Sequence, residues 1–220
     1  MSIKDNLQQL KDQLPADVTL VAVSKTKSPE TILEAYNAGQ RIFGESKAQE
    51  MVPKYEALPK DIQWHMVGHL QSNKVKYIAP FVSLIHSVDS LKLLKVINKE
   101  ALKNKRTIAC LLQIHIAEEV SKFGLSYDEC CEILESESYH NMKNIEIVGL
   151  MGMATFTDNH KQVEQEFKNL KNYFSKIKKQ YFPQQDTFKE VSMGMSDDFT
   201  IGIEEGSTMV RIGSAIFGSR

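Results

Sequence analysis

Strand-like and helix-like segments alternate along almost the whole chain, and this alternation limits the fold more than any other feature. Runs rich in β-branched and aromatic residues predict strands at residues 19–24, 41–44, 62–67, 82–87, 107–116, 145–151, 188–192 and 209–212. Helical patterns lie between them at residues 30–37, 47–58, 74–79, 91–104, 127–135 and 160–180, with a short acidic turn near 197–201. This order is typical of a parallel α/β protein.

Eight strands favour a (β/α)₈ (TIM) barrel over a doubly wound open sheet, which periodicity alone does not exclude. Polar residues follow the predicted strands at their carboxyl ends, where barrels place their sites. An additional helix is expected at residues 3–14, where Leu7 and Leu10 share one face, and we expect it to cover the barrel as a lid. We expect residues 1–220 to form a single domain.

Composition excludes several classes of protein. Hydrophobic residues make up 42% of the chain, charged residues 25%, and the formal net charge is −1, with no basic block suited to nucleic acid. Cys110, Cys130 and Cys131 cannot form a complete set of disulfides, which indicates a reducing compartment. We find no apolar run long enough for a membrane span and no signal core. His65 and His69 have a His-x-x-x-His spacing but straddle a strand end and a loop rather than one helix face, so we expect a cytoplasmic protein without a metal.

Lys25 ends the first predicted strand, and a desolvated lysine at a strand end is a candidate Schiff-base nucleophile. Closure of a barrel makes strands one and eight neighbours, which brings Lys25 near Arg211. The segments 192–197 and 212–214, after strands seven and eight, offer small residues whose N–H groups can bind an anion. Pyridoxal phosphate, with its aldehyde and its phosphate, meets both requirements.

Several ordered motifs together resemble one known family. They are Val-Ser-Lys-Thr at 23–26, Phe-Gly-Glu at 43–45, Trp-His at 64–65, Gly-His-Leu-Gln-Ser-Asn-Lys at 68–74, Gly-Leu-Met-Gly-Met at 149–153, Ser-Met-Gly-Met-Ser-x-Asp at 192–198 and Val-Arg-Ile-Gly-Ser-Ala-Ile-Phe-Gly at 210–218. From about residue 20 onward the chain resembles the pyridoxal phosphate homeostasis protein family, which is itself similar to the N-terminal barrel of alanine racemase.

The resemblance implies that Lys25 carries pyridoxal phosphate as an internal aldimine and that Arg211 faces the pyridine nitrogen. It also implies that the phosphate is held by four residues, which are Ser192, Gly194, Gly213 and Ser214. We expect His65 to make a hydrogen bond near the site. Met195, with Met151, Met153 and Met193, is expected to pack around the ring. Ser46 stands where the family usually has Asn.

Two functions remain open at this stage. The first is a carrier or regulator that acts in intracellular pyridoxal phosphate homeostasis without appreciable catalysis. We expect such a protein to be a monomer that contacts pyridoxal phosphate enzymes transiently. It is favoured because a cationic Arg211 keeps the pyridine nitrogen unprotonated, and because the chain has no room for the second domain of a racemase. The alternative is a small amino-acid racemase that uses Lys25 with Tyr36, Tyr77 or His65 as its second base.

Overall fold

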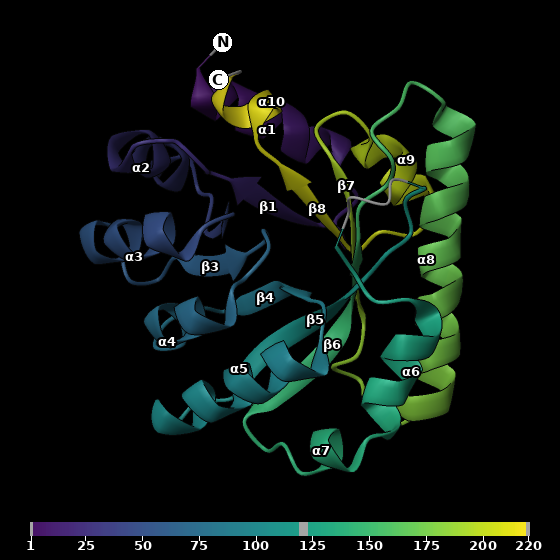
Figure 1. Ribbon diagram of the computed structural model, residues 1–220. Helices are drawn as coiled ribbons and strands as arrows, with labels where there is room; N and C mark the ends of the chain where they lie inside the picture. Colours follow the sequence, from purple (N-terminus) through teal and green to yellow (C-terminus); the bar gives the residue numbers. More distant parts are fainter. Residues whose placement is uncertain (1, 119–122, 219–220) are drawn as a thin grey trace.

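Parallel strands close into a barrel whose neighbours follow the order of the chain (Figure 1). The computed structural model describes residues 2–118 and 123–218. Within them the strands are β1 Thr19–Val23, β2 Ile42–Glu45, β3 Gln63–Met66, β4 Leu84–Val88, β5 Ile108–Ile114, β6 Ile145–Gly152, β7 Glu190–Met195 and β8 Met209–Ile212. Strand β1 pairs with β8 in a register that sets Val21 opposite Arg211. The predicted barrel is confirmed, and the open sheet is excluded.

Helices surround the barrel on its outer side (Figure 1). They are α1 Ile3–Gln13, α2 Pro29–Asn37, α3 Ala48–Ala57, η1 Ser72–Lys74, α4 Val75–Ile78, α5 Leu91–Lys103, α6 Tyr127–Glu135, α7 Glu137–His140, α8 His160–Tyr181, α9 Phe199–Glu204 and α10 Ser214–Phe217. Serine side chains cap α2, α5 and α6 at their first turns, which fixes where these helices begin. In the part of the chain that the structure describes, no helix combines the length and the apolarity that crossing a bilayer requires.

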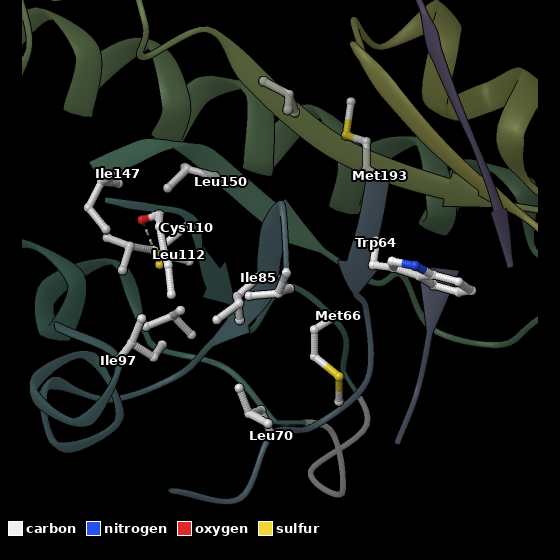
Figure 2. Close-up of a cluster of buried hydrophobic side chains, with 14 of the residues drawn as sticks. Trp64, Met66, Leu70, Ile85, Ile97, Cys110, Leu112, Ile147, Leu150 and Met193 are labelled. Atoms are coloured by element: carbon white, nitrogen blue, oxygen red, sulfur yellow. Dashed lines mark hydrogen bonds between the residues drawn. The ribbon is translucent and has the colours of Figure 1, made fainter. Parts of the chain in front are cut away.

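Two layers of buried side chains hold the barrel together. The outer layer joins the strands to the helices, and Figure 2 shows part of it, with Trp64 and Met66 of β3 and Ile97 of α5. The inner layer fills the barrel with Val21, Leu84, Leu111, Val148, Met151 and Met209. Because side chains fill the middle, open space remains only toward the two ends of the strands.

The first helix does not act as a lid. Leu7 and Leu10 of α1 are buried in the outer layer, and the helix packs beside α10 and α2 (Figure 1). The Asn6 side chain donates a hydrogen bond of 2.9 Å to the backbone oxygen of Ile216 in α10. Since α10 has only four residues, α1 supplies the remaining apolar surface that covers β8 and β1 on the outside.

Candidate functional site

A cavity of about 420 Å³ opens at the carboxyl ends of the strands. Its volume lies within the range of about 300–1,000 Å³ that small-molecule sites occupy. Six of the predicted site residues line it, namely Lys25, Ser46, Met195, Arg211, Gly213 and Ser214. They belong to β7 and β8 or follow β1, β2 and β8, and barrel closure brings these four strands together.

Lys25 extends from the end of β1 at the rim of this cavity. Its side chain is exposed rather than desolvated, and among the described residues its amine has no hydrogen-bond or ionic partner. The backbone on both sides is fixed. The Ser24 hydroxyl donates to Glu45 Oε1 at 2.6 Å, and the Thr26 N–H donates to Glu50 Oε2 at 2.9 Å. A free amine therefore stands on a rigid support.

A buried ion pair lies behind the lysine. Lys54 Nζ is 2.7 Å from Glu45 Oε1 and also donates to the Ser24 backbone oxygen at 2.9 Å. Burial raises the pKa of Glu45, and the hydrogen bonds from Lys54 and Ser24 oppose that rise. Replacing one partner would leave the other charge buried and uncompensated, so the pair ties β1, β2 and α3 together beneath Lys25.

Arg211 forms the cationic base of the cavity. Its guanidinium is almost completely buried and donates to Ser192 Oγ at 2.6 Å and to the Gly152 backbone oxygen at 3.0 Å. Burial lowers the pKa of Arg211 to about 10, which still leaves the group charged at neutral pH. The two bonds fix the plane of the guanidinium while other N–H groups remain for a ligand.

The loops after β7 and β8 meet at the edge of the cavity. The Asp198 carboxylate accepts a bond of 2.5 Å from the Met195 N–H, and Ser196 Oγ accepts one of 3.3 Å from the Gly213 N–H. Helix α10 begins at Ser214 without a side-chain cap. Its first N–H groups thus open toward the cavity edge, in an arrangement suited to an anion.

Ser192 and Gly194 do not line this cavity. The predicted seventh strand ended at residue 192, but β7 continues to Met195 through a register shift. Ser192 consequently lies inside the barrel, fully buried against Arg211 and His86. Gly194 has a φ of +95°, and a Cβ there would lie 2.9 Å from the Phe199 Cα, so this glycine permits the close approach of α9.

His65 and two of the four methionines are also placed elsewhere. His65 lines a second cavity at the opposite end of the barrel. Met153 and Met195 do line the carboxyl-end cavity, whereas Met151 belongs to the inner layer. Met193 points outward into the layer under the helices (Figure 2). For Met151 and Met193 the predicted position at the mouth is wrong, because β6 and β7 both extend beyond their predicted ends.

Sequence patterns missed several residues of the rim. Lys27 lines the cavity and donates to the backbone oxygens of Phe217 and Gly218, which joins the first loop to the last helix. Phe123 stacks on His69 with ring centroids 4.3 Å apart, and Phe156 is 85% exposed at the rim. For the two phenylalanines, the sequence offered one indication, which is that each is an aromatic residue in a loop between predicted elements. Within the described ranges, no group of three or more potential ligands is arranged to hold a metal ion.

Comparison with known proteins identifies the family. The model of the alanine racemase N-terminal domain matches residues 1–220. A protein of Aquifex aeolicus named pyridoxal phosphate homeostasis protein is 38% identical over 91% of this chain and 86% of its own. One of the same name from Escherichia coli K12 is 34% identical over 99% and 97%. The chain belongs to the pyridoxal phosphate homeostasis protein family.

Solved structures agree with this assignment. PipY of Synechococcus elongatus, in a structure with pyridoxal phosphate bound, is 33% identical, covers 99% of the chain and has a TM-score of 0.89. An alanine racemase of Bartonella henselae is 16% identical, with a TM-score of 0.72, and the chain covers 60% of its length. The second likeness shows the shared barrel fold alone.

Proposed function

We propose that this protein carries pyridoxal 5′-phosphate as a Schiff base on Lys25 and acts in intracellular pyridoxal phosphate homeostasis. The observation that carries the proposal is the amine of Lys25, which has no partner among the described residues, in a cavity that also holds the Arg211 guanidinium. The bound cofactor seen in PipY and the names of the relatives support it. When bound, the cofactor supplies an aldehyde that condenses with amines and a ring that withdraws electrons.

The residues present fit the cofactor. Ser196, Gly213 and Ser214 surround the uncapped start of α10, where the phosphate would receive backbone and hydroxyl hydrogen bonds. Arg211, fixed by its two internal bonds, would direct a remaining N–H toward the ring nitrogen. A nitrogen that faces a permanent cation stays unprotonated, and Met153 and Met195 supply apolar contact around the ring.

We further propose that the protein has no appreciable catalytic turnover. With its nitrogen unprotonated, the ring withdraws electrons weakly, and racemisation also needs a second base. None of the three bases considered for a racemase lines the carboxyl-end cavity as described. Tyr36 donates to Asp61, Tyr77 is exposed, and His65 lies at the other end of the barrel.

The covalent link is tested by borohydride reduction of the pyridoxal phosphate complex, followed by peptide mass mapping. The label is expected on Lys25 and absent from the Lys25→Ala protein, while Lys27→Ala, which removes the neighbouring amine of the cavity, keeps it. A label found on Lys27 or Lys74 in the unaltered protein would contradict the assignment.

Turnover is tested by deuterium exchange at the α-carbon of several L-amino acids in heavy water, with Lys25→Ala as the background. We expect no inversion above that background. Exchange with inversion at about 1–10³ per second, the ordinary range of enzymes, would instead favour the racemase. His69, an imidazole that does line the cavity, would then be the first residue to replace.

We also propose that residues 1–220 act as one pyridoxal-phosphate-binding domain, as a cytoplasmic monomer that meets the enzymes using this cofactor only transiently. The formal net charge of −1 supports the absence of a nucleic-acid partner. Light scattering of the loaded protein would test the monomer, since a dimer would have twice the 25.0 kDa mass of one chain.

A further inference from the structure

A second cavity of about 500 Å³ opens at the opposite, amino-terminal end of the barrel. The first residues of the strands line it, among them Thr19, Gln63, Leu84 and Met209. His65 lies at its inner side and is 4% exposed. The proposed cofactor site does not use this space, because the inner layer of side chains separates the two cavities.

A continuous chain of buried polar groups runs from this cavity to the base of the other one. His65 Nδ1 lies 3.0 Å from His86 Nε2, and His86 Nδ1 lies 3.0 Å from Ser192 Oγ. Ser192 Oγ in turn accepts a bond of 2.6 Å from Arg211. All four residues are at least 96% buried, with relative exposures of 4%, 0%, 0% and 4%.

The donors and acceptors that each side chain can offer fix the direction of these hydrogen bonds. Arg211 is a donor only, so Ser192 accepts from it, and the one described neighbour that can take the Ser192 hydroxyl hydrogen is His86 Nδ1. Burial lowers the pKa of His65 to about 3 and that of His86 well below 6.5, so both rings are neutral. With Nδ1 accepting, His86 carries its hydrogen on Nε2 and donates it to His65 Nδ1.

His65 must then carry its own hydrogen on Nε2. Nε2 lies across the ring from the bond to His86 and has no hydrogen-bond partner among the residues described. His86 stands two positions further along its strand than Leu84, which pairs with His65, so Nε2 faces the amino-terminal cavity. The Nε2–H group of His65 is therefore a hydrogen-bond donor in a fixed position, on a side chain that is 96% buried, and it is available to an acceptor in the cavity.

The outer wall of the cavity is acidic. Glu146, Asp186 and Glu190 line it against a single cation, Lys189. Glu190 Oε2 already accepts from the Thr208 hydroxyl at 2.7 Å, which holds that carboxylate in place. The excess of negative charge favours a cationic group on any molecule that enters.

We propose that the amino-terminal cavity is a ligand site for a small organic cation that carries a hydrogen-bond acceptor, such as an amino alcohol. The acceptor takes the Nε2 hydrogen of His65, and the cation lies between Glu146, Asp186 and Glu190. Apolar walls from Leu84 and Met209 surround the carbon atoms between the two groups. The site is independent of the cofactor.

Choline is the probe, because it has both groups and, lacking a primary amine, does not react with pyridoxal phosphate. Calorimetry with the protein before and after loading with pyridoxal phosphate should give one saturable site in each case. Tetramethylammonium has the charge without the acceptor and should bind about fivefold more weakly, the effect of one neutral hydrogen bond. Choline should also move the ¹⁵N resonance of His65 Nε2.

Two variants and a control place the site. Glu146→Gln should weaken choline binding about threefold, as expected for a partly exposed charge pair, and leave pyridoxal phosphate binding unchanged. His65→Phe should reduce choline affinity to that of tetramethylammonium. Glu164→Gln on the exposed side of α8 is the control and should have no effect.

The proposal is overturned if choline shows no saturable binding. It is equally overturned if choline binds no better than tetramethylammonium, or binds Glu146→Gln as well as the unaltered protein. Because the measurement is made first without cofactor, a failure to bind pyridoxal phosphate would refute the proposed function and leave this result standing.

Discussion

The two ends of this barrel differ in the sign of their charge and in the parts of the chain that line them. At the carboxyl end, Lys25, Lys27 and Arg211 face a cavity whose loops are joined by side-chain hydrogen bonds. At the amino end the cavity is lined by strand starts, with three carboxylates and one lysine. One end suits an anionic cofactor and the other a cation.

The difference follows from where the chain can vary without disturbing the strands. Loops after the strands can carry glycines, serines and free amines, whereas the strand starts remain tied to the sheet ladder. Buried polar groups connect the two ends through Ser192 and His86. These hydrogen bonds fix the orientation of Arg211 at one end and of His65 at the other.

Removal of the anion should have the largest effect at the carboxyl end. Charge-assisted hydrogen bonds contribute about 1.5–3 kcal/mol each, so losing two of them weakens binding by about 10²–10⁴-fold. We expect pyridoxal, which keeps the aldehyde and lacks the phosphate, to bind that much more weakly than pyridoxal phosphate in spectroscopic titrations. Equal affinities would show that the cationic character of this end has no role in binding.

The buried ion pair beneath Lys25 should matter more than an exposed pair of the same length. Lys54→Met leaves Glu45 buried without a partner, and we expect a loss of about 3–5 kcal/mol in the free energy of unfolding. Lys103→Met breaks an exposed contact, also of 2.7 Å, and should cost at most about 1 kcal/mol. Urea unfolding of both variants makes the comparison. Similar losses would mean that the buried Lys54–Glu45 pair contributes no more to stability than an exposed pair.

Sequence reasoning predicted the barrel because its evidence is repeated eight times. The predicted strands are apolar, and a helical pattern or turn separates each from the next, so small errors at the ends of elements did not change the topology. Helices α7 and α10 were missed because each has four residues, too few for a periodic pattern. A helix of a single turn is readily taken for a loop.

The site was predicted less completely for a related reason. Strand β7 contains Ser192, Met193 and Gly194, a small-residue stretch typical of a phosphate loop, yet it continues in the sheet through a register shift. Three residues of additional strand moved Ser192 from the mouth to the interior. The His65–His86–Ser192 chain was not visible in the sequence either, since the bonded pair His86 and Ser192 are 106 positions apart and meet only after closure.

Acid should weaken the interior that joins the two ends. His65 and His86 are neutral in the folded state because burial lowers their pKa, while unfolded histidines titrate near 6.5. The unfolded state then binds more protons, so stability is full above about pH 6.5 and falls as the pH drops toward 3. At about 1.4 kcal/mol per pH unit, His65 alone costs about 2 kcal/mol between pH 6.5 and 5, and His86 acts in the same direction.

Replacing one histidine isolates this contribution. His86→Leu should lower the free energy of unfolding at pH 7.5. It should also make the loss of stability between pH 6.5 and 5 smaller than in the unaltered protein. The exposed His160→Leu serves as the control and should keep the original pH dependence. Urea unfolding at three pH values measures both. An unchanged slope for His86→Leu would show that the interior pair is not the acid-sensitive element.

The smallest effect is expected in the backbone at the two ends. Thr26, in the loop after β1, and Lys105, in the turn before β5, are the non-glycine residues with positive φ in the described chain, at 67° and 54°. Glycine relieves this strain but adds unfolded-state entropy worth about 0.5–1 kcal/mol. Thr26→Gly should still raise stability slightly, by up to about 1 kcal/mol, because a β-branched side chain tolerates this region poorly. Lys105→Gly should change it less, since lysine is not branched there. Thermal unfolding of the pair decides the matter: a larger gain at Lys105 would place the greater backbone strain at the amino end, and the loop that carries Lys25 would then be the relaxed one.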